Sequence, residues 1–268
     1  MINRKDSRDA RIRLHQSKLV LKSCDYSGYC VSHNPEIIAD NSTHFVSKPW
    51  YRHFLRCLTL AMAVSAVAAY DFDRLQQQLS ARFGPARISL LRDWQGMLAE
   101  SASMTEKNKL GKVNDFINRH ITFEDDMSIW SQSDYWATPL EAIGQGRGDC
   151  EDFAIIKYYS LKDAGVPLTK LRLVYVKARL NGPSGPYLQA HMVLAYYPTP
   201  NAEPLVLDNL VRDIKPASQR SDLQPVFSFN SEAIWDGAAG NAARGSGGTG
   251  QLSRWQDLLQ RARNEGFD

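Results

Sequence analysis

The chain has 268 residues, of which 43% are hydrophobic and 23% are charged, as expected for a globular protein with one or two domains and a sizeable core. Its net charge of +3 comes from residues 1–70, which hold 10 Lys and Arg against 5 Asp and Glu, whereas residues 71–268 hold 22 against 24. Because the body of the chain has no basic surplus, nucleic-acid binding is excluded from the expected functions.

Residues 48–69, KPWYRHFLRCLTLAMAVSAVAA, have the three parts of a secretory signal peptide. A basic region holds Lys48, Arg52 and Arg56, and 13 apolar residues follow, which are too few to span a bilayer comfortably. The stretch contains Ala66-Val67-Ala68, the small-x-small pattern that signal peptidase reads. The alternative is a helix buried in the core.

The signal peptide predicts how the chain is divided. We expect an N-terminal extension at 1–47 that is not part of the mature protein, a signal peptide at 48–69, and one domain at 70–268 that is periplasmic and not stably inserted in the membrane. Cleavage removes three of the four cysteines and leaves only Cys150. An unpaired thiol in an exported protein is expected to be either reactive or deeply buried.

The periodicity of apolar residues then predicts the elements of the domain in chain order. A spacing of three to four residues predicts helices over 71–83, 88–100, 105–120, from about Cys150 to Gly165, and from about Leu252 to Arg263. The aromatic and polar stretch 125–140 is expected to be a structured loop, and the Gly- and Ala-rich residues 237–250 a flexible one.

After Gly165 the apolar period changes to two. This predicts strands at 171–180, 190–197 and 204–210, and PVFSFN at 225–230 is a candidate fourth. Turns are expected at Asn181-Gly182-Pro183 and between 197 and 204. Helices that precede strands indicate an α+β fold, with an antiparallel sheet packed on a central helix.

Three polar residues stand at the ends of these elements. Cys150 lies in the first turn of the fourth helix, His191 begins the second strand, and Asp208 ends the third. A helix N-terminus stabilises a thiolate and offers N–H groups to an oxyanion, so these residues fit a Cys-His-Asp triad for nucleophilic catalysis. The alternatives are an ordinary strand histidine and an aspartate that only caps its strand.

Asp149 and Glu151 flank the thiol, and their carboxylates disfavour the thiolate because they raise its pKa. They fit a calcium site, since Ca²⁺ takes carboxylate ligands and would cancel this charge. They also fit a helix start, where acids complement the helix dipole. The residues alone leave both interpretations open.

The segments DYWATPLEAIGQGRGDCED, GRGDCEDFAIIKYYSLKDAGV, HMVLAYY and PLVLDNL resemble the bacterial transglutaminase-like cysteine proteinases, and closely the LapG-type periplasmic proteases. The resemblance covers residues 71–235 and implies the papain-like core of the transglutaminase superfamily. The long N-terminal extension is unlike the usual family member. The resemblance implies calcium dependence, with Asp149 and Glu151 as ligands and Asp152 as a third.

The resemblance also implies a biological role. The expected substrate is the N-terminal region of a large surface repeat adhesin, whose cleavage near paired alanines releases cells from a biofilm. The expected partner is an inner-membrane cyclic-di-GMP receptor whose periplasmic domain sequesters the protease. A transglutaminase-type acyltransferase and a catalytically inactive calcium-binding module are the alternatives. Trp130 or Trp136 is a candidate for the wall of the substrate cleft.

Overall fold

The computed structural model describes residues 70–238 and 252–267. The expected extension and signal peptide, and residues 239–250 of the expected flexible loop, lie outside the described residues. The helices of the described part are α2 (Phe72–Phe83), α3 (Ile88–Ala102), α4 (Glu106–His120), α5 (Asp126–Trp130), α6 (Pro139–Gln145), α7 (Cys150–Asp163) and α8 (Ser253–Glu265), with short 3-10 turns at Pro85–Arg87, Leu168–Lys170 and Ala217–Gln219. In this part of the chain, none of the helices combines the length and apolar character needed to cross a bilayer.

The strands form two sheets. A small parallel pair consists of β1 (Thr122–Phe123) and β2 (Arg147–Gly148). The main sheet is antiparallel and has the order β6-β5-β4-β3-β7-β8. Its strands are β3 (Leu171–Gly182), β4 (Gly185–Tyr196), β5 (Leu205–Leu207), β6 (Lys215–Pro216), β7 (Leu223–Phe229) and β8 (Ile234–Asp236).

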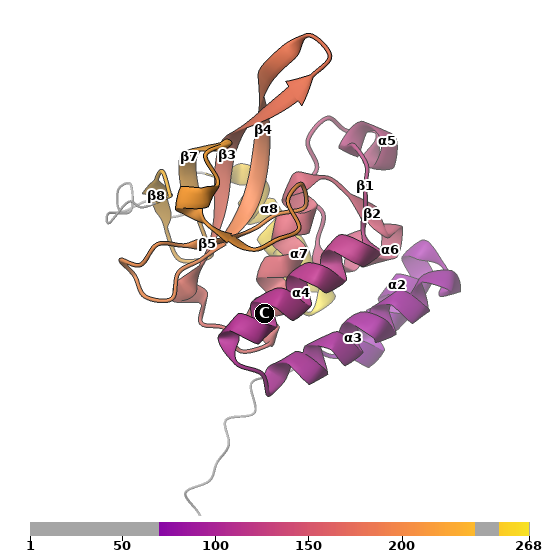
Figure 1. Cartoon of the computed structure of the whole chain (residues 1–268). Helices are drawn as coiled ribbons and strands as arrows, with labels where there is room; N and C mark the ends of the chain where they lie inside the picture. Colours follow the sequence, from indigo (N-terminus) through magenta and orange to yellow (C-terminus); the bar gives the residue numbers. More distant parts are fainter. Residues whose placement is uncertain (1–69, 239–251, 268) are drawn as a thin grey trace, which may run out of the picture. The chain divides into compact units, whose positions relative to one another are not determined.

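The predicted α+β fold is confirmed. Helix α7 lies between the sheet and the helices α3 and α4 (Figure 1). Ten consecutive residues of α7, Asp152 to Leu161, are buried, which is typical of a helix enclosed on several sides. The one-sided periodicity of α2, α3 and α4 reflects their place on the outside of this core.

The structure corrects the expectation of a loop at 125–140. This stretch contains α5 and the start of α6. Helix α5 has five residues, which is too short to show a helical period. The start of α6 has a recognisable signal, because Thr138 and Glu141 form a capping box around Pro139.

The strand boundaries also differ from the prediction. Strand β4 begins at Gly185 rather than at 190, and Asn181 and Gly182 belong to β3, so that only Pro183 and Ser184 form the turn. Residues 185–190 are all exposed, and a segment with no buried face carries no apolar alternation. Strands β6 and β8 have two and three residues and were not predicted.

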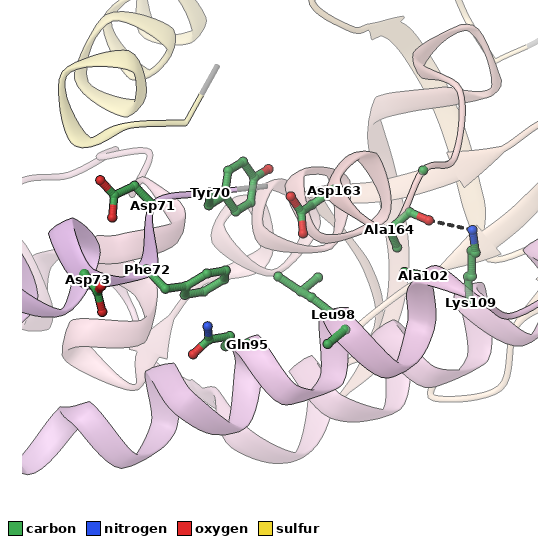
Figure 2. Close-up of a pocket in the computed structure, with 12 residues that line it drawn as sticks. Tyr70, Asp71, Phe72, Asp73, Gln95, Leu98, Ala102, Lys109, Asp163 and Ala164 are labelled. Atoms are coloured by element: carbon green, nitrogen blue, oxygen red, sulfur yellow. Dashed lines mark hydrogen bonds between the residues drawn. The ribbon is translucent and has the colours of Figure 1, made fainter. Parts of the chain in front are cut away.

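The C-terminal end of α7 borders a cavity of about 670 Å³ (Figure 2). Its walls include Tyr70 and Asp163, and Lys109 donates a hydrogen bond from Nζ to the carbonyl oxygen of Ala164. The ring of Tyr70 is buried against Trp94, and its hydroxyl donates to the carbonyl oxygen of Tyr159 at 3.1 Å. The domain is therefore packed from its first described residue.

Candidate active site

The chain enters α7 through a tightly packed turn. Gly146 ends α6 with a φ of 65°, and a Cβ at this position would lie 2.6 Å from Nη1 of Arg87. A Cβ on Gly148 would lie 2.7 Å from the carboxylate of Asp152. Glycine is favoured at 146 by its positive φ, since the Arg87 guanidinium could move, and at 148 by the close approach of Asp152, including its Cβ.

Cys150 is the first residue of α7 and its thiol is partly buried. The Sγ atom donates a hydrogen bond to Oε2 of Glu151 at 2.9 Å. Burial raises the pKa of the Cys150 thiol far above its ordinary value, and the charges of Glu151 and Asp149 raise it further. The thiol is therefore held protonated by its burial and by these two charges.

His191 and Asp208 form a buried pair at the junction of β4 and β5. The His191 Nε2 atom lies 2.8 Å from Oδ1 of Asp208, and the two residues are 4% and 1% exposed. The strands are paired one residue before Asp208, where Leu207 lies opposite Leu194. Strand register thus brings together two residues that are 17 positions apart in the sequence.

Arg220 completes this arrangement, and the sequence analysis did not identify it. Its Nη2 atom donates to Oδ2 of Asp208 at 2.7 Å, and its guanidinium also contacts Asp222. The pKa of Asp208 falls to about 2, because the hydrogen bonds and charges of His191 and Arg220 outweigh the effect of burial. Asp208 is therefore ionised, and both of its oxygens are oriented.

A cleft of about 470 Å³ connects these groups. Cys150 and His191 both line it, and Asp208 lies behind His191, outside its walls. Trp136 is part of the wall, as expected for one of the two tryptophans. Trp130 packs against Tyr135 instead, with ring centroids 4.6 Å apart.

The acids predicted at the start of α7 belong to a larger cluster. Carboxylate oxygens of Asp126, Asp149 and Asp152 lie within 4.8 Å of one another, and so do those of Asp126, Asp134 and Glu151. Burial and the neighbouring carboxylates raise the pKa of Asp149 strongly and that of Asp126 to about 6. Oδ1 atoms of Asp126 and Asp149 are buried without a hydrogen-bond partner in the described structure.

These observations fit a divalent cation held by hard oxygen ligands. Buried polar atoms normally have partners, so the two unpartnered Oδ1 atoms indicate a group that is missing from the protein itself. Asp152 differs from the others, because its oxygens accept hydrogen bonds from the backbone N–H groups of Ala137 at 2.8 Å and Asp149 at 3.3 Å. Its role as a third ligand stays a prediction, and it has a capping role in any case.

The sequence analysis did not identify Asp126 and Asp134 as candidate ligands. Both lie in the stretch that was expected to be a loop, 23 and 15 positions before Asp149. No regular spacing connects them to the acids of α7, because α6 and β2 intervene. The only signal was the concentration of acids in a loop just before the cysteine motif.

Similarity to known proteins is found in both the sequence and the structure. Residues 95–223 match the family model described as bacterial transglutaminase-like cysteine proteinase BTLCP. The structure is similar to that of Legionella pneumophila LapG, with 37% identity, a TM-score of 0.59, and coverage of 72% of this chain and 98% of that one.

Two further structures of Legionella pneumophila LapG match. The EGTA-treated form has 37% identity, a TM-score of 0.60, and coverage of 72% of this chain and 98% of that one. The calcium-bound form has 36% identity, a TM-score of 0.57, and coverage of 71% and 98%. A search of curated proteins gives no match. With these similarities over almost the whole length of LapG, the chain belongs to the bacterial transglutaminase-like cysteine proteinase family.

Proposed function

We propose that this protein is a calcium-dependent cysteine endopeptidase of the periplasm, with Cys150, His191 and Asp208 as its catalytic triad. One observation carries the proposal: a thiol at the first turn of a buried helix lines the same cleft as a histidine that is paired with an ionised aspartate. This is the arrangement that nucleophilic catalysis by a thiol needs.

The chemistry follows from these positions. His191 accepts the proton of Cys150, and the sulfur attacks the scissile carbonyl carbon. The backbone N–H groups in the first turn of α7 would stabilise the oxyanion, since the first N–H groups of a helix have no partner within it. The C–N bond breaks as His191 gives its proton to the leaving amine, which leaves a thioester that water hydrolyses. Asp208 fixes the tautomer and supports the imidazolium, and Arg220 holds Asp208.

Asp126, Asp149 and Glu151 are the residues best placed to hold Ca²⁺, with Asp134 and Asp152 beside them. The ion supplies positive charge that cancels the carboxylates next to the thiol. When Glu151 serves as a ligand, its carboxylate is no longer free to accept the hydrogen bond from the Cys150 thiol. The similarity to a LapG that was solved with calcium supports this assignment.

The resemblance supports the finer proposal about biology. We assign as substrate the N-terminal region of a large repeat adhesin, whose cleavage releases the adhesin and promotes biofilm dispersal. The partner is the periplasmic domain of an inner-membrane cyclic-di-GMP receptor. The signal peptide at 48–69 would deliver the protease to the same compartment.

A cleavage assay tests the proposal. The processed protein is incubated with the N-terminal fragment of a repeat adhesin encoded beside it, with calcium or with chelator, and the products are identified by mass spectrometry. Cleavage at one site with calcium only is the expected result. An added primary amine that becomes attached to the substrate would instead indicate acyl transfer, and no product at all would support an inactive calcium-binding module.

A further inference from the structure

The hairpin of β3 and β4 has an edge that no strand of the described residues covers. Strand β4 pairs with β3 along its whole length, from Gly185 to Tyr196. On its other side, it pairs with β5 only at Leu194, Ala195 and Tyr196. The hairpin extends beyond the rest of the sheet, as Figure 1 shows. In the part of the chain that the structure describes, residues 185–193 therefore have a strand on one side only.

The direction of the free backbone groups can be derived. Arg179 lies opposite Leu188 in the β3–β4 pair and donates its backbone N–H to the carbonyl oxygen of Asp222 at 2.8 Å, on the side away from β4. Leu188 therefore also points away from its partner strand, β3. In an antiparallel strand, the N–H and C=O of one residue point to the same side, and alternate residues point to opposite sides. Leu188 and Ala190 consequently direct their N–H and C=O groups to the free edge.

Two other contacts agree with this assignment. Gly185 pairs with Gly182 across the two-residue turn, which places the odd-numbered residues of β4 toward β3. The backbone N–H of Tyr197 donates to the carbonyl oxygen of Lys170, just before β3, at 2.8 Å. Pro186 stands at a position whose backbone nitrogen faces the free edge, where a missing N–H costs no bond within the sheet.

This edge leads directly into the cleft. Gln189, Ala190 and His191 are consecutive residues of its wall. Tyr187 and Leu188, farther out, are 48% and 53% exposed. Natural proteins usually protect a free edge with charged side chains, but residues 185–192, GPYLQAHM, carry no Lys, Arg, Asp or Glu. An uncharged edge that ends at the candidate nucleophile is suited to pairing with another strand.

We propose that the edge of β4 at Leu188 and Ala190 binds the substrate as an added strand, with its scissile bond at Cys150. The inference rests on the proposed function and adds to it a mode of substrate recognition. The enzyme reads the backbone of an extended segment over several residues on one side of the cleavage site. A substrate segment that is already folded into a helix or a paired strand is not accepted, because its backbone groups are occupied.

Methylation of the substrate backbone tests this pairing. After the cleavage site in the adhesin fragment is mapped, a synthetic 20-residue peptide that spans it is made with a single N-methyl group at each position in turn. Strand pairing predicts that N-methylation lowers kcat/KM about five- to tenfold at each of two positions that lie two residues apart on one side of the scissile bond. N-methylation at the position between them should leave kcat/KM unchanged. Equal losses at adjacent positions, or no losses, would overturn the proposal.

A pair of variants locates the edge on the enzyme. Leu188→Pro removes the outward N–H, whereas Leu188→Ala removes the same side chain and keeps that N–H. We expect kcat/KM about five- to tenfold lower for L188P than for L188A. N-methylation of the peptide at the outer of the two sensitive positions should also lower kcat/KM by a smaller factor in L188P than in the wild-type protein. Equal kcat/KM in the two variants contradicts the proposal.

Two controls separate the possible failures. The rate at which iodoacetamide alkylates Cys150 reports whether each variant is correctly folded, and if L188P is not, the methyl scan on the wild-type protein decides alone. If the wild-type protein cleaves the fragment but N-methylation of the peptide gives no alternating pattern of losses in kcat/KM, only the strand-pairing inference is refuted. A wild-type protein that does not cleave the fragment refutes the proposed function together with it. Concentration-dependent dimerisation that L188P abolishes would assign the edge to a second copy of the chain and overturn the proposal.

Discussion

The two ends of α7 differ in how well their polar groups are satisfied. At the C-terminal end, the backbone N–H of Gly165 donates to Lys162 and that of Val166 to Leu161, both at 2.9 Å, which forms a Schellman motif with Gly165 at a φ of 83°. Lys109 adds a cation and a hydrogen bond at the Ala164 carbonyl oxygen. These bonds agree with the rules for ending a helix, although Asp163, the last residue of α7, is an acid whose pKa burial raises.

The N-terminal end follows the same rules only in part. Acids in the first turn complement the helix dipole, and Asp152 caps the backbone of Asp149. Yet Asp126 crowds against Asp149 and Asp152 and also against Asp134 and Glu151. Two buried oxygens have no partner, and the thiol donates its hydrogen bond to a carboxylate. Sites that violate local rules inside a well-packed fold are expected to be functional or strained. The difference between the ends therefore places function at Cys150.

The largest expected effect is that of Cys150→Ala. We expect cleavage of the adhesin fragment to fall to background, because Cys150 supplies the thiol that lines the cleft beside His191. The melting temperature should change little, since the side chain is small and only partly buried. Product formation by mass spectrometry and thermal unfolding are measured on the same preparation. Turnover that stays at the wild-type level would disprove the protease assignment.

The buried pair behind His191 should have the next largest effect. Asp208→Asn is expected to lower kcat by about 10⁴, because the amide no longer fixes the imidazole tautomer. Arg220→Met should lower kcat less, since Asp208 keeps its bond to His191 but loses the one that orients its second oxygen. Arg220→Lys, which keeps the charge, is the matched control. A kcat for Arg220→Met equal to that of wild type would show that Arg220 does not position Asp208.

The acid cluster should separate activity from stability. Asp149→Asn is expected to abolish calcium-dependent cleavage and to raise the melting temperature in chelator by about 2–4 °C, because it removes a buried carboxyl group whose raised pKa destabilises the folded state at neutral pH. Asp126→Asn should weaken calcium binding in calorimetry, although it lies outside the cysteine motif. Asp125→Asn, at the neighbouring position, is the control for Asp126→Asn. Undiminished calcium binding in both Asp149→Asn and Asp126→Asn would exclude these acids as ligands.

The well-satisfied end of α7 should show the reverse pattern. Lys109→Met removes the hydrogen bond to Ala164 and is expected to lower the free energy of unfolding by about 1–2 kcal/mol. The kcat and the calcium affinity should stay at wild-type values, since this end contacts none of the candidate site residues. Urea unfolding and the cleavage assay measure the two effects. A loss of calcium affinity in this variant would contradict the separation of the two ends.

The sequence predicted the parts of this contrast that local patterns encode. The helical period, the stop at Gly165 and the change to a period of two located α7 and the central strands, and Cys150, His191 and Asp208 stood out because each is polar at the end of an apolar element. The sequence did not indicate Arg220 or Asp126. Arg220 is brought to the site by the 3-10 turn Ala217–Gln219 and Asp126 by α5, and no periodicity links either residue to its partners.

The alkylation rate of Cys150 over a range of free calcium tests the central claim most directly. The processed protein and its Asp149→Asn variant are treated with iodoacetamide at fixed pH. For the wild-type protein, we expect a second-order rate constant of alkylation that is low in chelator and rises with calcium. For the variant, we expect a rate constant that does not respond to calcium. A wild-type rate constant that is the same in chelator and in saturating calcium would contradict the claim that the acids around Cys150 restrain the thiol until a cation binds.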